Sequence, residues 1–337
     1  MALGRRALAC SVSLETASRF WELVTMLRAP ILFFSGKGGV GKTTTAAAYA
    51  LAAAESGKHV LLVSTDPAHN LGDAFACPLS GSPTRVAEGL DAIEIDPDEE
   101  CSRYIEQVKQ NIRATVRSTM IEEAERQIDM AGRAPGAYEA ALFDRMVAIL
   151  LEDARPVEAD GYDQVIFDTA PTGHTIRLLT LPELMGAWVD GLLRQRSAHN
   201  HERSQWLGDG EVPEDPLYDL LSERRRRIAR VRDLMLDPAL TAFVFVLTPE
   251  HLPVAETRRA VAELDDHHLH VGAIVVNKIL PAEADGAFLA KRRAAEAEHL
   301  AAIEQHFADR TRYHIPLREA DVRDLGDLRA IGAYLQA

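Results

Sequence analysis

The chain has 337 residues, enough for one large domain or two small ones, and its apolar content of 47% is ordinary for a globular protein. Its net charge of −14 argues against sequence-independent nucleic-acid binding, which requires clustered lysine and arginine. The three cysteines form no Cys-x-x-Cys pair, which argues against a disulfide framework and favours a reducing, cytoplasmic setting. No apolar run reaches the roughly 18 residues that span a bilayer, so we expect no direct membrane span.

The N-terminal elements predict an α/β fold. We interpret residues 1–26 as a poorly ordered N-terminal extension and residues 27–337 as a single domain. The apolar run Ile31–Ser35 ends at a glycine-rich turn, which is typical of a buried parallel strand. An alanine-rich helix ending near Gly57 and a second apolar strand, His59–Asp66, follow. This order predicts a central, mostly parallel sheet with helices on both faces.

The rest of the chain adds strands and two long helical stretches. One stretch runs from about residue 97 to 151 and is broken around 132–136; the other runs from about 181 to 236, with a polar break near 208–216. We expect both to form a helical insertion subdomain at one end of the sheet. The basic run Arg224–Arg227 lies in the second stretch, and we interpret it as a solvated helix face. Further strands are predicted at Ala92–Asp96, Gln164–Asp168, Thr241–Leu247, Gly272–Asn277 and Arg312–Ile315.

The glycine-rich turn after the first strand fits the pattern GxxxxGK[ST]. Glycines allow backbone N–H groups to converge on phosphate oxygens, and the positive end of the next helix points to the same place. Lys42 can reach the β- and γ-phosphates, and the Thr43 hydroxyl can bind Mg²⁺. The turn therefore predicts a P-loop NTPase that binds a nucleoside triphosphate and Mg²⁺. Its nucleotide-binding residues are Gly36, Lys37, Gly38, Gly39, Val40, Gly41, Lys42, Thr43 and Thr44.

Lys37 is a second lysine in this loop, at a position that the P-loop pattern leaves free. One interpretation is a cation supplied across a subunit interface, which neutralises charge on the leaving phosphate as an arginine finger does. The other is a solvent-exposed lysine. The loop sequence alone leaves both open.

Two acidic residues follow apolar strands. Ligands of open parallel sheets bind at the carboxyl ends of the strands, which places Asp66 beside the phosphate loop. A carboxylate there can orient the attacking water, although Asp66 also suits the N-cap of the next helix. Asp168 ends a second buried strand, the Walker B arrangement that holds Mg²⁺ directly or through water. The turn after it, Pro171–Gly173, has the character of a loop that responds to the γ-phosphate.

Three segments together resemble the ArsA/Get family of ATPases: GKGGVGKTT, STDPAHNLGDAF and DTAPTGHTIRLL. This family contains the arsenical-pump-driving ATPases and the cytosolic ATPases that target tail-anchored membrane proteins, and it belongs to the deviant Walker A class of P-loop proteins. The resemblance extends from about Leu27 to the C-terminus. The block Ala134–Met146 is similar to the bacterial branch of the family, and this chain has a single ATPase unit.

The resemblance implies a role for several residues. Lys37 matches the lysine that reaches the nucleotide of the facing protomer, which implies a homodimer, since the chain has one ATPase unit. Asp66 matches the catalytic carboxylate, and Asp168 opens a switch segment that includes His174. The family's nucleotide contacts further along the chain match Glu250, Asn277 and Pro316, the last two at the adenine.

The resemblance also implies an output driven by Mg-ATP hydrolysis. Our first expectation is an ATPase that drives an arsenite or antimonite efflux permease. The alternative is a targeting factor or holdase for tail-anchored or other hydrophobic membrane-protein segments. A third hypothesis, a positioning ATPase that acts on membrane or DNA, ranks last because the C-terminus has no basic face.

Cysteine placement bears on the cargo. Eukaryotic targeting ATPases carry a zinc-binding Cys-x-x-Cys pair past the adenine asparagine, and the corresponding segment here has no cysteine, so we expect no zinc. Trivalent arsenic requires soft thiolates. We interpret Cys77 and Cys101 as small core residues rather than metalloid ligands.

Overall fold

The computed structural model describes residues 29–66, 70–115, 121–132, 136–154, 161–169, 190–191, 193–194 and 216–335. Within these residues the chain forms an eight-stranded sheet with the order β3-β4-β2-β5-β1-β6-β7-β8. All neighbouring strands are parallel except the edge pair β3–β4. The strands are β1 (Ile31–Ser35), β2 (Val60–Ser64), β3 (Thr84–Ala87), β4 (Leu90–Glu94), β5 (Gln164–Asp168), β6 (Thr241–Leu247), β7 (Val271–Ile279) and β8 (Thr311–Pro316).

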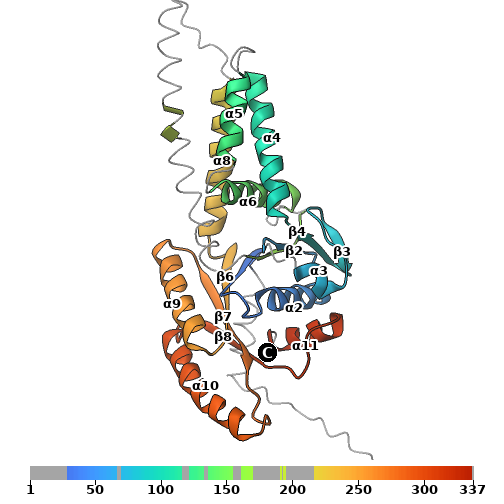
Figure 1. The fold of residues 1–337 in the computed structure, drawn as a ribbon, viewed down its shortest axis with the longest axis vertical. Coiled ribbons are helices and arrows are strands. Elements are labelled where there is room, and N and C mark those ends of the chain that lie inside the picture. Colours follow the sequence, from blue (N-terminus) through green and yellow to red (C-terminus); the bar gives the residue numbers. More distant parts are fainter. Residues whose placement is uncertain are drawn as a thin grey trace, which may run out of the picture.

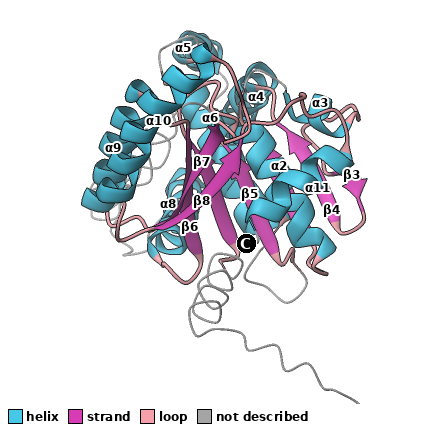
Figure 2. Ribbon diagram, turned by 90° about the horizontal axis from the view of Figure 1, so that it is seen from below, coloured by secondary structure: helices cyan, strands magenta, loops and turns pink. Residues whose placement is uncertain are grey.

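Helices cover both faces of the sheet (Figure 2). On one face, α2 (Lys42–Glu55) packs against α11 (Leu325–Leu335). A methyl group added to Gly332 of α11 would lie 3.0 Å from a backbone oxygen of α2, so the alanine-rich sequence of α2 and this glycine permit close helix packing. The helices α9 (His251–Asp266) and α10 (Ala287–His306) lie on the opposite side (Figure 2).

The core alternates between the two faces with the period of a strand. Phe33 faces the side of α8 and α9 and stacks between Phe167 and Phe243, with ring centroids 4.8 and 5.0 Å apart. Phe34 points the other way, into the cluster formed with α2. Helices cover both faces of the sheet, so side chains on both sides of a central strand are buried. The central strands are therefore continuously apolar, as the sequence predicts for a doubly covered parallel sheet.

A helical subdomain extends beyond the sheet (Figure 1). Its described helices contact one another in the pairs α4–α5, α4–α6 and α6–α8, and η2 is a π-helical turn that continues α6. In α8, Arg224–Arg227 each pair with a carboxylate, so the basic run is an ion-paired helix face. The helices are α4 (Pro97–Thr115), α5 (Ile121–Ala131), α6 (Ala137–Ala148), η2 (Ile149–Asp153) and α8 (Pro216–Leu236).

The structure differs from the sequence predictions at particular elements. Strand β3 was not predicted, because it is short, half-exposed and antiparallel and therefore lacks a continuous apolar run. The predicted strand Ala92–Asp96 begins two residues earlier, and the first helical stretch consists of three helices rather than two. The N-terminal extension, the turn Pro171–Gly173 and most of the second helical stretch before α8 lie outside the described residues. Among the described helices, none is long and apolar enough to cross a membrane.

Candidate active site

The phosphate loop connects the carboxyl end of β1 to the start of α2. Two of its glycines are required by their surroundings. Gly36 has φ 148° and an added Cβ would lie 2.1 Å from the Val246 carbonyl oxygen, whereas at Gly41 (φ 94°) it would lie 2.4 Å from Nδ2 of Asn277. In the described structure no side chain caps the start of α2. The backbone N–H groups at this helix N-terminus are thus placed to receive an anion, as the motif predicts.

The side chains of Lys42 and Asp66 form an ion pair next to the phosphate loop. The Lys42 ammonium lies 3.8 Å from Oδ2 of Asp66, and the Lys42 side chain is only 4% exposed. Asp66 follows β2, and its backbone N–H donates a hydrogen bond to the Ser64 hydroxyl. The predicted phosphate-binding lysine and the predicted catalytic carboxylate are therefore brought together, although they are 24 positions apart in the sequence.

Asp168 is the most unusual side chain of the site. It is fully buried at the end of β5, opposite Ser64 of β2, and neither of its carboxylate oxygens has a partner of full hydrogen-bond geometry among the described residues. Burial raises the pKa of Asp168 to about 7, although the neighbouring Thr43 hydroxyl and Lys42 ammonium oppose this shift. The negative charges of Asp66 and Glu94 raise the pKa further. Such an unsatisfied buried carboxylate marks a place prepared for a positive charge.

The residues around Asp168 fit Mg²⁺, which the sequence motif implies. Magnesium prefers hard oxygen ligands and is commonly held by one or two carboxylates together with substrate phosphates. The Asp168 carboxylate and the Thr43 hydroxyl provide such oxygens next to the phosphate loop. A bound cation would also satisfy the two orphaned oxygens of Asp168.

Lys37 is not simply solvent-exposed. Its ammonium donates a hydrogen bond to Oε1 of Glu256 on α9 at 3.0 Å, and each of the two side chains is about one-third exposed, 34% and 37%. In the single chain the second loop lysine is thus turned toward α9, while Lys42 is paired with Asp66. Its predicted role across a subunit interface stays a prediction.

The predicted adenine residues lie near the loop to different degrees. Asn277 touches it directly: Nδ2 donates a hydrogen bond to the Val40 carbonyl oxygen at 2.8 Å. Pro316 ends β8 opposite Ile279, two residues beyond Asn277 on the neighbouring strand. Glu250 precedes α9 and forms an ion pair with Arg292 of α10 at 2.6 Å. Their contacts with a nucleotide stay predictions.

Comparison with known proteins decides the family. Residues 29–337 match the family model described as anion-transporting ATPase, the ArsA ATPase family. The chain belongs to this family. The predicted family and the predicted P-loop α/β fold are therefore confirmed, and the chain is an ATP-hydrolysing enzyme.

Relatives of this ATPase carry two kinds of name. It is 34% identical to the putative arsenical pump-driving ATPase 2 of Aquifex aeolicus, over 90% of this chain and 98% of that protein. It is 36% identical to the putative arsenical pump-driving ATPase of Halobacterium salinarum over 93% of this chain, but spans only 45% of that protein. It is also 34% identical to the ATPase GET3 of Meyerozyma guilliermondii, over 90% of this chain and 89% of that protein.

Three residues of this ATPase that touch the site were missed by the sequence reasoning. Glu94 ends β4 beside Ser64 and acts on Asp168; it was missed because the predicted strand Ala92–Asp96 placed it in the middle of the strand rather than at its end. Lys278 donates a hydrogen bond from its ammonium to the Gly39 carbonyl oxygen at 2.8 Å. Glu256, the partner of Lys37, has no local signal, because the two residues are 219 positions apart.

Proposed function

We propose that the chain is a Mg²⁺-dependent ATPase that acts in the cytoplasm as a homodimer and couples nucleotide-driven opening and closing to transport. The observation that supports this most strongly is the meeting of four groups at one sheet edge: the Lys42 ammonium, the Thr43 hydroxyl and the carboxylates of Asp66 and Asp168. The Lys42 ammonium can bind the phosphates, Thr43 and Asp168 offer oxygen ligands for a metal ion, and the Asp66 carboxylate can orient the attacking water.

In the proposed mechanism the phosphates of ATP lie on the loop backbone at the start of α2, with Lys42 at the β- and γ-phosphates. Mg²⁺ held by Thr43 and Asp168 would neutralise charge on the phosphates. Asp66 orients the attacking water and accepts its proton. Its carboxylate lies 3.8 Å from the Lys42 ammonium, which places it beside the phosphates that Lys42 binds. Lys37 exchanges Glu256 for the partner's nucleotide when the dimer closes, and adds positive charge where the transition state needs it.

For the transported cargo, our first proposal is that hydrolysis drives an arsenite or antimonite efflux permease. The names of the bacterial and archaeal relatives support this role. The described cysteines do not favour metalloid binding on this chain: burial raises the pKa of the Cys101 thiol, and Cys77 is only partly exposed. In this proposal the permease, rather than the ATPase, binds the metalloid.

The second candidate is a targeting factor or holdase for hydrophobic membrane-protein segments, as the GET3-named relatives suggest. The helical subdomain favours this candidate, because large apolar side chains are exposed on α5, α6 and α8. A cavity of about 90 Å³ also opens between α4, α6 and α8. This is far too small for a helix about 10 Å wide, so a client requires the helices to separate. The exposed residues are Met130, Tyr138, Tyr218 and Leu220.

Steady-state ATP hydrolysis by the purified chain tests the proposal, with Asp66→Asn as the inactive control. We expect the control to lose roughly 10³-fold in kcat, because a neutral amide cannot accept the proton of the attacking water. Equal activity in the control would contradict the assigned role of Asp66. Adding arsenite, or a carrier-bound apolar helical peptide of about 20 residues, separates the two cargoes. Stimulation by the peptide alone would favour the second candidate.

A further inference from the structure

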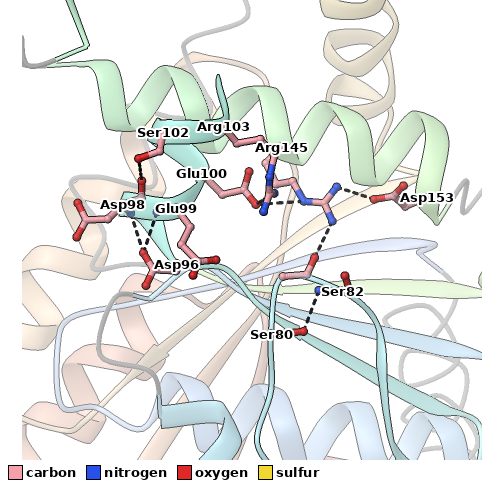
Figure 3. A network of polar contacts seen from close by, with 11 residues as sticks. Ser80, Ser82, Asp96, Asp98, Glu99, Glu100, Ser102, Arg103, Arg145 and Asp153 are labelled. Carbon is pink, nitrogen blue, oxygen red and sulfur yellow. Dashed lines mark hydrogen bonds and ion pairs between the residues drawn. The ribbon is translucent and has the colours of Figure 1, made fainter. Parts of the chain in front are cut away.

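Arg145 of α6 joins the end of its own helix to two segments that precede it by 45 and 64 positions in the sequence (Figure 3). One guanidinium nitrogen donates a hydrogen bond to Oδ2 of Asp153 at 2.7 Å, and another donates to the Gly81 carbonyl oxygen at 3.0 Å. The third lies 3.7 Å from Oε1 of Glu100 in α4. The Arg145 side chain is 16% exposed. A planar guanidinium that donates two hydrogen bonds in fixed directions and pairs with a third group sets the relative positions of its partners, which a flexible lysine would not do.

The loop that Arg145 holds belongs to the nucleotide-binding half of the molecule. Gly81 follows α3 (Asn70–Phe75), which begins shortly after Asp66. The carbonyl oxygen of Ser80, the residue before Gly81, accepts a hydrogen bond from the backbone N–H of Glu94 at 3.0 Å. A displacement of this loop therefore acts on both α3 and β4.

Glu94 connects the same loop to the catalytic carboxylates. Its side chain accepts a hydrogen bond from the Leu71 backbone N–H in α3 at 3.1 Å. It also lies close enough to Asp168 to act on that carboxyl group electrostatically. A continuous set of contacts thus runs from α3 and Glu94 through the loop to Arg145, and from there into the helical subdomain. Contacts of this kind can couple two sites when the connecting element has two arrangements.

The helical side of this connection is irregular. Asp153 ends η2, a π-helical turn, and π-turns inside helices are frequent at functional sites. Glu100, in the first turn of α4, also pairs with Arg103. Arg145 therefore pairs with both the start of α4 and the end of η2 (Figure 3).

We propose that Arg145 is a positioning residue for ATP hydrolysis. It fixes the loop 80–82 relative to the helical subdomain, and through this loop it positions α3 and Asp66. This inference rests on the proposed function, because it assumes that Asp66 acts on ATP. Arg145 itself touches neither the phosphate loop nor the carboxylates of the site; it acts through the loop. Coupling is reciprocal, so the same contact transmits the state of the nucleotide site to α4 and α6.

The test compares Arg145→Gln with wild-type protein in two measurements. We expect kcat to fall about tenfold with the KM for ATP within twofold, because misplacement of Asp66 affects the transition state while the phosphate loop is intact. In hydrogen exchange, a non-hydrolysable ATP analogue should change protection in α4 and α6 of the wild type. In Arg145→Gln this change should be lost, while protection of α2 by the analogue persists. The kcat and the exchange response of Arg145→Lys should lie between those of the wild type and Arg145→Gln. This variant serves as the test if Arg145→Gln does not fold.

Arg227→Gln is the matched control. Arg227 forms an ion pair with Glu152, also within η2, at 2.8 Å, but its pair joins only helices of the subdomain. We expect this variant to keep wild-type kcat and the wild-type exchange response. Equal loss in both variants would reduce Arg145 to a structural residue and overturn the proposal, as would an Arg145→Gln protein that responds like the wild type. A wild-type chain that does not hydrolyse ATP would instead refute the proposed function.

Discussion

A buried aspartate lies at each end of the sheet, and the two carboxylates have opposite surroundings. Asp91, at the amino end of β4, is surrounded by donors: its carboxylate accepts hydrogen bonds from Arg85 and from the Tyr162 hydroxyl, and contacts His59. Burial would raise the pKa of Asp91, but these hydrogen bonds outweigh it and lower the pKa. Asp168, at the carboxyl end of β5, lacks such donors among the described residues, and its pKa is raised to about 7.

This difference separates stability from function. The partners of Asp91 come from β3, the start of β2 and the segment before β5, so the carboxylate fastens neighbouring strands together. The Tyr162 ring also stacks on His59, with centroids 4.2 Å apart, which adds to this attachment. The Thr43 hydroxyl and the Lys42 ammonium only partly offset the burial of Asp168, so its charged form costs free energy in the folded protein. A chain retains such a group where a ligand supplies the missing partner.

The largest effect is expected at the carboxyl end, where Lys37→Ala should lower kcat by roughly 10²- to 10³-fold, since one transition-state cation is lost. The thermal unfolding temperature should change little, because the exposed pair with Glu256 contributes little to stability. Steady-state hydrolysis and thermal unfolding measure the two effects.

Mixing variants decides whether Lys37 acts across the interface. In a dimer of one Lys37→Ala chain and one Asp66→Asn chain, the first chain keeps Asp66 and receives Lys37 from its partner. An equal mixture should therefore recover about one quarter of the wild-type turnover, given random exchange into a symmetric dimer. A lysine that acts in its own chain would leave the mixture as inactive as either variant alone.

The second prediction concerns the energetic cost of burying the Asp168 carboxylate. Without nucleotide and with Mg²⁺ chelated, Asp168→Asn should be more stable than the wild type at pH 8. A rise in pKa from 3.8 to about 7 corresponds to about 4 kcal/mol. The buried amide of asparagine offsets part of this gain, so we expect a net increase of about 2 kcal/mol in the free energy of unfolding, together with a loss of hydrolysis.

The pH dependence of this gain has a definite sign. Folded wild-type protein keeps a proton on Asp168 that the unfolded chain releases, so its stability falls as the pH rises from about 4 to about 7. The advantage of Asp168→Asn should accordingly shrink toward pH 5. Denaturant unfolding at pH 5 and pH 8 measures it. A variant that is less stable than the wild type at pH 8 would contradict this cost, because it would mean that the charged Asp168 stabilises the folded protein.

The sequence was sufficient for those parts of the molecule whose signal is local. Strands β5 and β6 were predicted to the residue, because a doubly covered strand is a continuous apolar run. The rule that ligands gather at the carboxyl ends of parallel strands was enough to expect Asp66 and Asp168 beside the loop, and the structure brings both there.

What the sequence did not indicate depends on contacts between distant segments. The burial of Asp168 follows from the two strands that flank β5 and not from the sequence around Asp168 itself. The pair of Lys37 with Glu256 and the three partners of Arg145 join segments whose spacing carries no pattern. The cluster around Asp91 was missed for a further reason: β4 starts two residues before the predicted strand, which excluded Asp91 from it.

The last prediction tests the amino end of the sheet. Asp91→Asn should lower the free energy of unfolding by about 1–3 kcal/mol, since the charge-assisted hydrogen bond from Arg85 is lost and a buried polar group is left poorly matched. Because the pKa of Asp91 is lowered in the folded state, this contribution is present above the unfolded value of 3.8 and is lost as the pH falls below it. The difference in free energy of unfolding between Asp91→Asn and the wild type should therefore be constant from pH 8 to pH 5. Over the same range the difference for Asp168→Asn should shrink.

Turnover of Asp91→Asn per folded molecule should stay at the wild-type level, because the cluster around Asp91 lies at the opposite end of the strands from Asp66. A fall in kcat at unchanged stability would instead mean that the two ends of the sheet are coupled.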